Sequence, residues 1–350
     1  MIKLAIIGVG NCASSLIQGI EYYKDKKNKT GFIAEKIFGY EIGDVEIVGA
    51  IDIDQRKIGK DVSEAIFTDP NCAVKFCDVP KKNVEVMKGE VYDGVAKHMT
   101  DSFKVDDNQK SVDVAAYLKS ADADFAICYL PVGSEEAVRF YAQKSLEAGV
   151  GFINAIPVFV CSTDEWSKKY ADAGLVCIGD DIKAQFGATY THRILTESLL
   201  KRGIAIDDMY QLNVGGNTDF ENMIDEERLT NKRISKTTAV DSLFGDTEKP
   251  PVRIGPSDYI PHLNDTKICY INIHGRQFGD QKIEIDLKLK VEDSPNSAGI
   301  MIDVVRLAKG AKDKGMKGEV SIISSFGFKH PKVKMHEDQI YPQLQEFMNS

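Results

Sequence analysis

The sequence predicts an α/β fold in which a doubly wound parallel sheet carries an inserted α+β domain built on a mainly antiparallel sheet. Three observations support this prediction. Apolar segments alternate with amphipathic ones over residues 1–200, a glycine turn directly follows the first apolar segment, and strict apolar–polar alternation begins after about residue 205. Continuous apolar strands are typical of parallel sheets covered on both faces, whereas alternation is typical of an antiparallel sheet with one wetter face.

The expected strands of the parallel sheet are short and almost wholly apolar. They span residues 2–7, 45–53, 124–130, 151–156 and 175–181, with a helix at 135–148. Residues 24–44 interrupt this order as a polar insertion. The later part of the chain is expected to contain alternating strands at 209–215, 267–275 and 283–292, a polar stretch at 225–265 and a helix at 299–314.

Composition and charge exclude several classes of protein. The chain has 350 residues with 44 basic and 53 acidic side chains, a formal charge of −9, whereas nucleic acids and anionic membranes attract basic surfaces. No apolar stretch approaches the ~18 residues that span a bilayer. Seven cysteines without a CxxC pair indicate neither a disulfide framework nor a cysteine zinc site. We therefore expect a cytoplasmic protein that binds neither nucleic acid nor membrane.

The glycine turn follows the first expected strand at once. Its sequence, GVGNCA at residues 8–13, places GxGxxA between a strand and a helix, which is the dinucleotide-binding arrangement of Rossmann folds. Gly8 permits the tight turn, Gly10 lets the backbone approach a pyrophosphate, and Ala13 is small enough for the third position. Further contacts are expected from Asn11, Cys12 and Ser14. Because N–H groups at a helix start favour phosphates, we expect NAD or NADP here.

An acidic residue at the end of the second strand is expected to bind the adenosine ribose. Asp52 and Asp54 compete for this role, and Asp52 fits the strand end better, although a solvated turn aspartate is the alternative. We identify no basic residue at this strand end, which favours NAD over NADP. The turn at Pro131 is expected to border the nicotinamide, with a plain loop as the alternative.

Lysines, and not histidines or serines, are the candidate catalytic groups. The sequence contains no HExxH and no GxSxG motif, and His192 lies in a helical pattern typical of a core residue. Lys232 and Lys236 are four residues apart, so they share a face if their segment is helical. Two ammonium groups held together resist protonation and attract anions, which suits a phosphorylated sugar or an enolate. By spacing alone, a solvated lysine face is the more frequent case.

Several motifs together resemble one enzyme family. They are GVGNCASSL, CYLPVGSEEA, GDDIKAQFGAT, LNVGGNTDFENM, RISKTTAV, IGPSDY and VEDSPNSAG, and they cover essentially the whole chain. Together they resemble the myo-inositol-1-phosphate synthases of the archaeal and bacterial type. The resemblance implies that D-glucose 6-phosphate is converted to 1D-myo-inositol 3-phosphate with catalytic NAD. In that reaction C5 is oxidised, C6 loses a proton, the enolate attacks the C1 aldehyde, and the cyclic ketone is reduced again.

The resemblance also implies roles for residues that spacing does not single out. By motif it implies a catalytic set of Lys232, Lys236, Lys267, Lys329, Asp293 and Asn217. On the cofactor side it adds Asp61, Asp181, Lys183 and Asp219. Clustered ammonium groups in a dry site stabilise an enolate and hold a phosphate. Ala184 stands where serine is common, so a contact there must come from the backbone, and Asp61 equally fits a helix N-cap.

Assembly and domain roles are likewise implied by the resemblance. It implies a homotetramer joined through the β-rich domain and, in prokaryotic members, use of a divalent or monovalent cation, whose ligands stay open because no cluster has diagnostic spacing. We expect an NAD-binding domain at 1–200, a catalytic and oligomerisation domain at 201–295, and a C-terminal segment at 296–350 that returns to the first domain.

Two other functions stay open at this point. One is a net NAD-dependent dehydrogenase acting on a sugar phosphate or a semialdehyde, which would need the same turn and lysines. The other is a non-enzymatic NAD-sensing module. The lysine set weighs against the module, because a sensor has no need to concentrate cations over a nicotinamide.

Overall fold

The larger of the two sheets in the computed structural model is parallel throughout. The structure describes residues 1–24, 26, 30–106, 108–225, 230–245 and 249–350. Seven strands follow the order β11-β6-β5-β4-β1-β2-β3. They are β1 (Ile2–Ile7), β2 (Val45–Asp52), β3 (Val86–Lys88), β4 (Phe125–Cys128), β5 (Gly151–Asn154), β6 (Val176–Gly179) and β11 (Gly318–Glu319). The predicted doubly wound α/β fold is confirmed.

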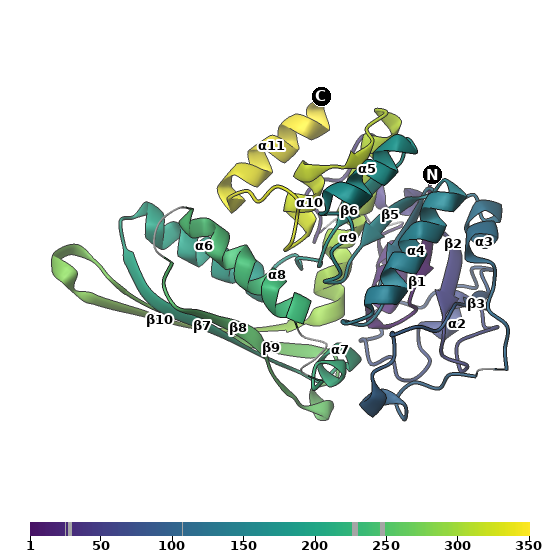
Figure 1. The fold of residues 1–350 in the computed structure, drawn as a ribbon, viewed down its shortest axis with the longest axis horizontal. Helices are drawn as coiled ribbons and strands as arrows, with labels where there is room; N and C mark the ends of the chain where they lie inside the picture. Colours follow the sequence, from purple (N-terminus) through teal and green to yellow (C-terminus); the bar gives the residue numbers. More distant parts are fainter. Residues whose placement is uncertain (25, 27–29, 107, 226–229, 246–248) are drawn as a thin grey trace.

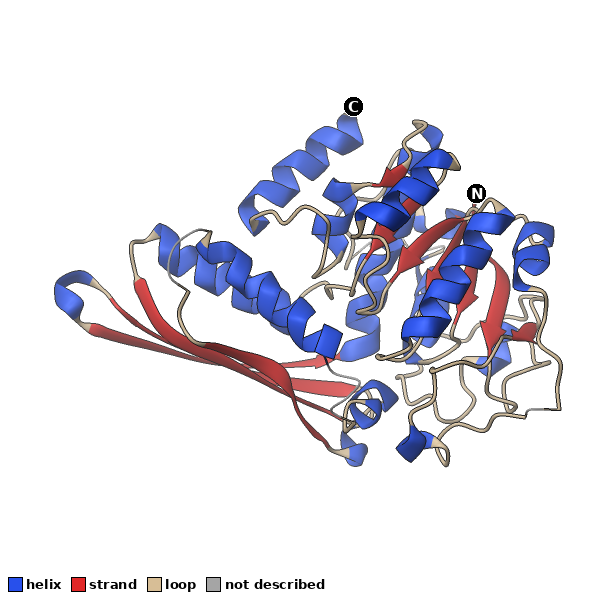
Figure 2. Ribbon diagram, in the orientation of Figure 1, coloured by secondary structure: helices blue, strands red, loops and turns tan. Residues whose placement is uncertain are grey.

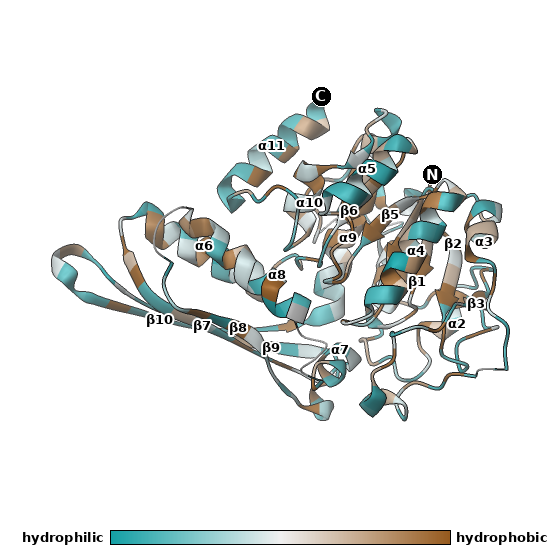
Figure 3. Ribbon diagram, viewed as in Figure 1, coloured by the Kyte–Doolittle hydropathy of each residue, from teal (hydrophilic) through white to brown (hydrophobic). Residues whose placement is uncertain are grey.

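Helices cover both faces of this sheet (Figure 2). One face carries α1 (Asn11–Tyr23) and α9 (Asp293–Asp313), and the other carries α3 (Val114–Ser120), α4 (Glu135–Ala148) and α5 (Asp164–Asp172). Along β1, Leu4 and Ile6 join the first buried cluster, whereas Ala5 and Ile7 join the second. Because both faces are buried, the strand is almost wholly apolar, as Figure 3 shows for the sheet as a whole.

The smaller sheet extends away from the larger one and has the order β10-β9-β7-β8 (Figure 1). Its strands are β7 (Ala205–Gly215), β8 (Val252–Tyr259), β9 (Thr266–Arg276) and β10 (Lys282–Glu292). The β7–β9 and β9–β10 pairs are antiparallel, and the β7–β8 pair is parallel, so the sheet is mainly antiparallel, as predicted. Two helices, α6 (Ala188–Lys201) and α8 (Thr230–Asp241), lie along one face, and none of the described helices covers the other face (Figure 1).

Two segments differ from the sequence-based expectation. The stretch at 225–265 contains α8 and β8, which its many polar residues concealed. The helix expected from residue 299 begins at Asp293 in the structure. Its start was missed because most residues of its first two turns are polar. The remaining helices are α2 (Val62–Ala65), α7 (Thr218–Asn222), α10 (Ser321–Gly327) and α11 (Glu337–Asn349).

The insertion at 24–44 and the C-terminal segment both pack against the larger sheet. Within the described part of the insertion, Ile37 and Ile42 are fully buried, and Arg306 of α9 donates to the carbonyl of Glu35 at 2.9 Å. The C-terminal segment contributes β11 to the sheet. Both α6 and α9 run across the expected boundaries at 200 and 295. No helix in the described ranges combines the length and apolar character needed to cross a membrane.

Candidate active site

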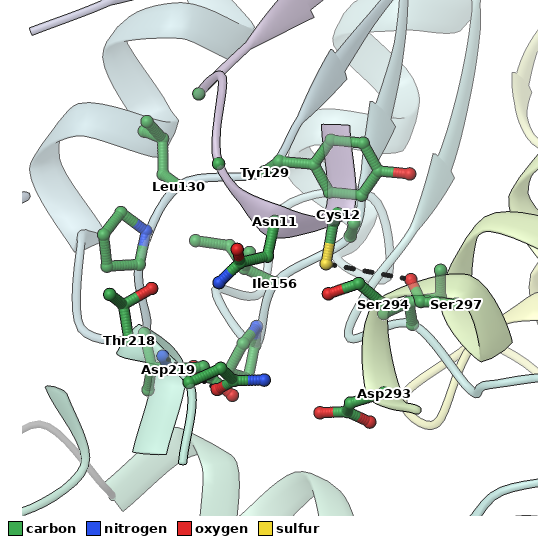
Figure 4. Close-up of a pocket in the computed structure, with 18 of the residues that line it drawn as sticks. Asn11, Cys12, Tyr129, Leu130, Ile156, Thr218, Asp219, Asp293, Ser294 and Ser297 are labelled. Carbon is green, nitrogen blue, oxygen red and sulfur yellow. Dashed lines mark hydrogen bonds between the residues drawn. The ribbon is translucent and has the colours of Figure 1, made fainter. Parts of the chain in front are cut away.

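One large cavity lies between the two sheets, with about 1660 Å³ of empty space that is partly open to solvent. The larger sheet contributes the residues that follow the carboxyl ends of its strands, where α/β sheets bind nucleotides. The smaller sheet contributes β7, β9 and the helices near them. Figure 4 shows Asn11 and Cys12 from the glycine turn on one side, with Asp219 and Asp293 below them.

The glycine turn at the cavity has the backbone geometry that its motif requires. Gly8 has a φ of +93°, and a Cβ there would lie 2.8 Å from the carbonyl oxygen of Tyr129. Gly10 is the N-cap of α1 and makes no side-chain cap, and a Cβ at this position would meet nothing within 4 Å. The first N–H groups of α1 therefore lack a capping side chain beside an open space, which is the arrangement that favours an anion.

Asp52 and Asn11 fix the turn from two sides. Asp52 Oδ2 accepts a hydrogen bond from the Val9 N–H at 2.7 Å, and Asn11 Oδ1 accepts one from the Cys72 N–H at 2.7 Å. Of the two competing aspartates, Asp52 lines the cavity, whereas Asp54 is fully buried against Arg56.

Three lysine–aspartate pairs line the cavity, and each joins two different elements. They are Lys232 of α8 with Asp219 of α7 at 2.9 Å, Lys267 of β9 with Asp293 of α9 at 3.1 Å, and Lys329 with Asp181 at 2.9 Å. The segment of Lys232 and Lys236 is helical, which is the condition for the shared face, and both lysines are buried, so they do not form a solvated face. A cavity that holds so many fixed charges suits an anionic substrate.

Lys236 differs from the other cavity lysines because, within the described residues, its Nζ makes no hydrogen bond and no ion pair. The side chain is 4% exposed. Burial and the charges of Lys232, Lys267 and Lys329 lower the pKa of Lys236 well below its ordinary value. Lys236 is therefore the cavity lysine that most readily becomes a neutral amine.

The paired lysines keep their charge to different degrees. Burial opposes the charge of Lys232, but the carboxylates of Asp219 and Asp181 outweigh burial and raise the pKa of Lys232. Asp293 raises the pKa of Lys267 in the same way. For Lys329, burial and the neighbouring lysines outweigh Asp181, so its pKa is lowered. The cavity thus holds firmly charged lysines beside easily deprotonated ones.

Most residues expected from the sequence lie at this cavity. Its lining includes the whole expected catalytic set, Lys232, Lys236, Lys267, Lys329, Asp293 and Asn217. Its lining also includes the cofactor-side residues Gly8, Gly10, Asn11, Cys12, Asp52, Pro131, Asp181 and Asp219. Ala184 lines it as well.

Four expected cofactor residues do not line the cavity. Ala13 and Ser14 point into the core from the first turn of α1, where the Ser14 hydroxyl accepts a hydrogen bond from the Gln18 amide. Asp61 is the N-cap of α2 and accepts from the Ser63 N–H, the alternative given above. Lys183 forms a buried ion pair with Glu337 at 2.7 Å. A linear motif does not show which side of an element faces the cavity, so it does not separate these four residues from those that line it.

Two polar residues of β7 line the cavity without having been predicted from the sequence. Gln211 and Asn213 are buried on the inner face of the strand and are joined by a hydrogen bond of 3.1 Å. Gln211 also lies 3.2 Å from His192, whose pKa burial lowers to about 4. His192 is thus the core residue that its helical pattern predicted. The missed signal is the placement of Gln211 and Asn213 on the same strand face as apolar Met209.

Cys12 lies beside Ser297 of α9, with 3.9 Å between the sulfur and the hydroxyl oxygen (Figure 4). Burial raises the pKa of the Cys12 thiol to about 12, so the sulfur stays protonated and unreactive.

Comparison with known proteins identifies the family. A family model described as Myo-inositol-1-phosphate synthase matches residues 187–294. The inositol-3-phosphate synthase of Mycolicibacterium smegmatis is 46% identical over 355 residues, which cover 99% of this chain and 98% of that protein. The chain belongs to the inositol-3-phosphate synthase family. The Corynebacterium glutamicum inositol-3-phosphate synthase is 45% identical over 356 residues, which cover 99% of this chain and 98% of that protein.

A solved inositol-phosphate-synthase-like structure has the same fold. A myo-inositol-1-phosphate synthase-related protein from Thermotoga maritima matches with a TM-score of 0.83 at 22% identity, over 100% of this chain and 98% of that one. The bacterial inositol-3-phosphate synthase family, the Rossmann-type fold and the enzymatic function implied by the resemblance are confirmed.

Proposed function

We propose that this cavity converts D-glucose 6-phosphate to 1D-myo-inositol 3-phosphate with bound NAD, using its four lysines as the charged and proton-moving groups. Membership of the inositol-3-phosphate synthase family supplies the reaction. The observation that carries the residue assignment is a single cavity in which a nucleotide-type turn faces three paired lysines and one lysine without a partner among the described residues.

The residues around the glycine turn fit NAD. The uncapped start of α1 suits a pyrophosphate, and Asp52 at the end of β2 suits the ribose hydroxyls. When bound, NAD supplies a two-electron acceptor that the reaction restores at its end. The expectation of no basic residue at this strand end is wrong, because Arg56 lies there. Its guanidinium is held by Asp54 and by the Ser102 carbonyl, which still supports NAD over NADP.

We assign proton movement at the carbon next to the new ketone to Lys236. That carbon, C6, becomes acidic once C5 is a ketone, and a general base works best when its pKa lies near the operating pH. The Lys236 amine meets this need because burial and three neighbouring lysines lower its pKa. After taking the proton, the new ammonium group lies in the cavity beside the enolate oxygen, whose charge it offsets.

The firmly charged lysines hold the anions of the reaction. Asp219 and Asp293 keep Lys232 and Lys267 protonated and oriented. Fixed ammonium groups in a buried site stabilise the enolate, the developing alkoxide and the phosphate without reorganisation. Asn217, at the N-terminus of α7, lines the same wall, where the second N–H of its side-chain amide adds a polar contact.

Incubation of the purified protein with glucose 6-phosphate and NAD tests this function. The synthase forms a phosphorylated inositol, with no accumulation of NADH absorbance. A net dehydrogenase accumulates NADH as substrate is consumed, and a sensing module gives neither product. Either of the last two results would replace the proposed reaction.

The cation implied by the resemblance has no matching ligand cluster at the cavity. Within the described residues, the group of side chains close enough to hold a metal ion is Glu197, His336 and Asp338, and none of them lines the cavity. The cavity carboxylates of Asp219, Asp293 and Asp181 already pair with lysines. We therefore assign no residue to a cation.

We propose that copies of the chain form a homotetramer through the open face of the smaller sheet. That face exposes Tyr210, Leu212 and Tyr270, and Leu212 lies opposite Tyr270 in the β7–β9 pairing. Contiguous exposed apolar side chains are typical of an interface.

The division of labour along the chain is also a proposal. Residues 1–200 hold NAD, 201–295 supply catalysis and assembly, and 296–350 complete the first domain through β11. The free state of all seven cysteines supports a cytoplasmic location.

A further inference from the structure

The buried carboxylate of Asp265 has no assigned role in the chemistry described above. Asp265 precedes β9, is fully buried and does not line the cavity. Among the described residues it forms no ion pair; neutral donors surround it instead. Burial and the nearby charge of Asp293 raise the pKa of Asp265 to about 6. A buried carboxylate without a cation is costly to keep, and this calls for an explanation.

The hydrogen bonds of Asp265 reach two separate walls of the cavity. Oδ1 accepts from the Asn217 amide at 3.1 Å and from the Ser294 hydroxyl at 2.8 Å. Oδ2 accepts from the Ser294 N–H at 3.0 Å, and the backbone carbonyl of Asp265 accepts from the Asp293 N–H at 2.9 Å.

On the first wall, Asp265 holds the residue that starts α7. Asn217 Oδ1 caps this short helix by accepting from the N–H groups of Asp219 and Phe220. Both polar atoms of the Asn217 side chain therefore make hydrogen bonds: its oxygen accepts from N–H groups of α7, and its nitrogen donates to Asp265. Asp219, two residues on, pairs with Lys232. A chain of contacts thus links Asp265, through Asn217 and the first residues of α7, to this lysine–aspartate pair.

On the second wall, Asp265 replaces the missing cap of α9. The N-cap residue Glu292 makes no cap bond with its side chain, which accepts from the Thr266 hydroxyl instead. Asp265 supplies an acceptor for the Ser294 N–H from another element. Asp293, next to Ser294, pairs with Lys267. Figure 4 shows Asp293 and Ser294 at this end of α9, facing the cavity with Asp219.

We propose that Asp265 is a positioning residue for the synthase reaction: its one carboxylate sets the Lys232–Asp219 pair and the Lys267–Asp293 pair relative to each other. The inference rests on the proposed function of those lysines. Asp265 touches no substrate and acts through Asn217 and Ser294. Two ammonium groups that must address different oxygens of one small substrate need this mutual alignment, and a misplacement of about 1 Å costs a large part of the rate.

Substitution of Asp265 by asparagine in the full-length enzyme tests this role. Asparagine keeps the volume but offers one acceptor oxygen, so the Asn217 amide or the Ser294 N–H loses its partner. We expect kcat for glucose 6-phosphate, normalised to bound NAD, to fall roughly 10- to 100-fold. We expect KM and the NAD dissociation constant to change by less than about 3-fold, because the binding groups stay present.

The matched control is Asp303→Asn. Asp303 is also a fully buried carboxylate, its pKa is also raised to about 6, and it lies on α9. It accepts hydrogen bonds from the Ile33 N–H and from Arg306, and none of these three residues lines the cavity. This variant should lose thermal stability and keep kcat within about 2-fold.

A second variant keeps the proposal testable if Asp265→Asn does not fold. Ser294→Ala removes one donor and leaves Asp265 in place, and we expect kcat to fall roughly 3-fold or more. In the double variant the two losses should be less than additive, because both act through one carboxylate.

Several results would overturn the role. They are an unchanged kcat in Asp265→Asn, a loss confined to NAD binding or to folding, and an equal kcat loss in Asp303→Asn. If no variant and no wild-type enzyme forms inositol phosphate, the proposed function fails instead, and this result is distinguishable because it appears before any substitution.

Discussion

Lys232 and Lys236 lie one turn apart on α8, yet their pKa values move in opposite directions. Lys232 reaches Asp219 and keeps its charge, whereas Lys236 pairs with no carboxylate of the described residues and is opposed by the charge of its neighbour. Their spacing predicted a shared face if the segment is helical, and the segment is helical. The spacing did not predict the difference between their pKa values. That difference depends on α7, which brings Asp219 to one lysine only.

Replacement of Lys236 tests its assignment as the proton-moving group. We expect Lys236→Met to lower kcat by ~100-fold or more, since general-base catalysis is worth that much. Lys236→Arg should not restore the rate, because a guanidinium stays protonated. In the wild-type enzyme the lowered pKa makes the neutral amine abundant above that pKa, so kcat should fall as the pH drops through it.

A buried lysine outside the cavity serves as the control for Lys236. Lys88 donates to the backbone carbonyls of Asp106 and Gln109 and does not line the cavity. Lys88→Met should change stability and leave the pH profile of kcat unchanged. Retention of most of the wild-type kcat by Lys236→Arg would contradict the assignment.

Single residues line the cavity as expected where a motif fixes the backbone, and they lie outside its lining where the direction of the side chain decides. Gly8 and Gly10 line the cavity because a tight turn leaves no choice of direction. Ser14 is fully buried, and its hydroxyl accepts a hydrogen bond from the Gln18 amide within α1. Lys183 lies in one of the motifs that resemble the synthase family, yet its amine pairs with Glu337 of α11. The motif contains no information about that distant residue.

At the scale of elements, the two glycines before α1, Gly8 and Gly10, have different roles. Gly8 needs its positive φ and its close contact with the Tyr129 carbonyl, so its role is in the fold. Gly10 has extended backbone that any residue adopts, and a side chain there would have open space around it. The fold therefore does not require glycine at position 10, whereas the proposed close approach of a pyrophosphate does.

Alanine substitutions at the two positions should therefore behave differently. Gly10→Ala should keep a melting temperature close to wild type and weaken NAD binding roughly 10-fold or more, about 1.4 kcal/mol, because the methyl group occupies the pyrophosphate approach. Gly8→Ala should lower the melting temperature because the backbone is strained. Calorimetry with NAD and thermal unfolding measure both effects. Equal NAD affinity in Gly10→Ala and wild type would rule out this placement of the pyrophosphate.

The helix α11 is joined to the body by a buried carboxylate. Glu337 lies between Lys183 and Arg193, at 2.7 Å from each. Glu337→Gln leaves these buried cations without a full counter-charge, and we expect a loss of about 3 kcal/mol in the free energy of unfolding. The adjacent Asp338 forms an exposed pair with Lys201, so Asp338→Asn should cost less than about 1 kcal/mol. Denaturant titration of both variants checks the contrast, which similar losses would contradict.

Elements with uniform patterns were predictable, and those with mixed patterns were not. The strands of the larger sheet are buried on both faces and read as apolar segments. By contrast, β8 carries polar residues along an edge, and α8 places its lysines inside the molecule, so both were hidden in a polar stretch. The Asp265 bonds were also out of reach, because they join the start of β9 to α7 and α9.

At the scale of the whole molecule, the site exists only where the two sheets meet. The sequence predicted each sheet and many of the side chains at its end, but the pairs across the cavity, such as Lys329 with Asp181, are tertiary contacts. The same architecture leaves one face of the smaller sheet without a described helix while α6 and α8 cover the other (Figure 1). Tyr210 and Leu212 on β7 and Tyr270 on β9 are each more than one-third exposed on that face.

Charged substitutions on this open face test the proposed tetramer. We expect the wild-type chain to have the mass of a tetramer by light scattering, and the double variant Leu212→Lys, Tyr270→Glu to dissociate, because it places charge at the centre of an apolar contact. The variant should stay folded, since both side chains point away from the buried cluster under α6 and α8. Tyr341→Glu, an equally exposed aromatic position on α11, should leave the mass unchanged. A double variant of unchanged mass would place assembly at another surface, and a monomeric wild-type chain would exclude the tetramer. Dissociation with intact NAD binding would show that the nucleotide turn of each chain binds NAD without its neighbours.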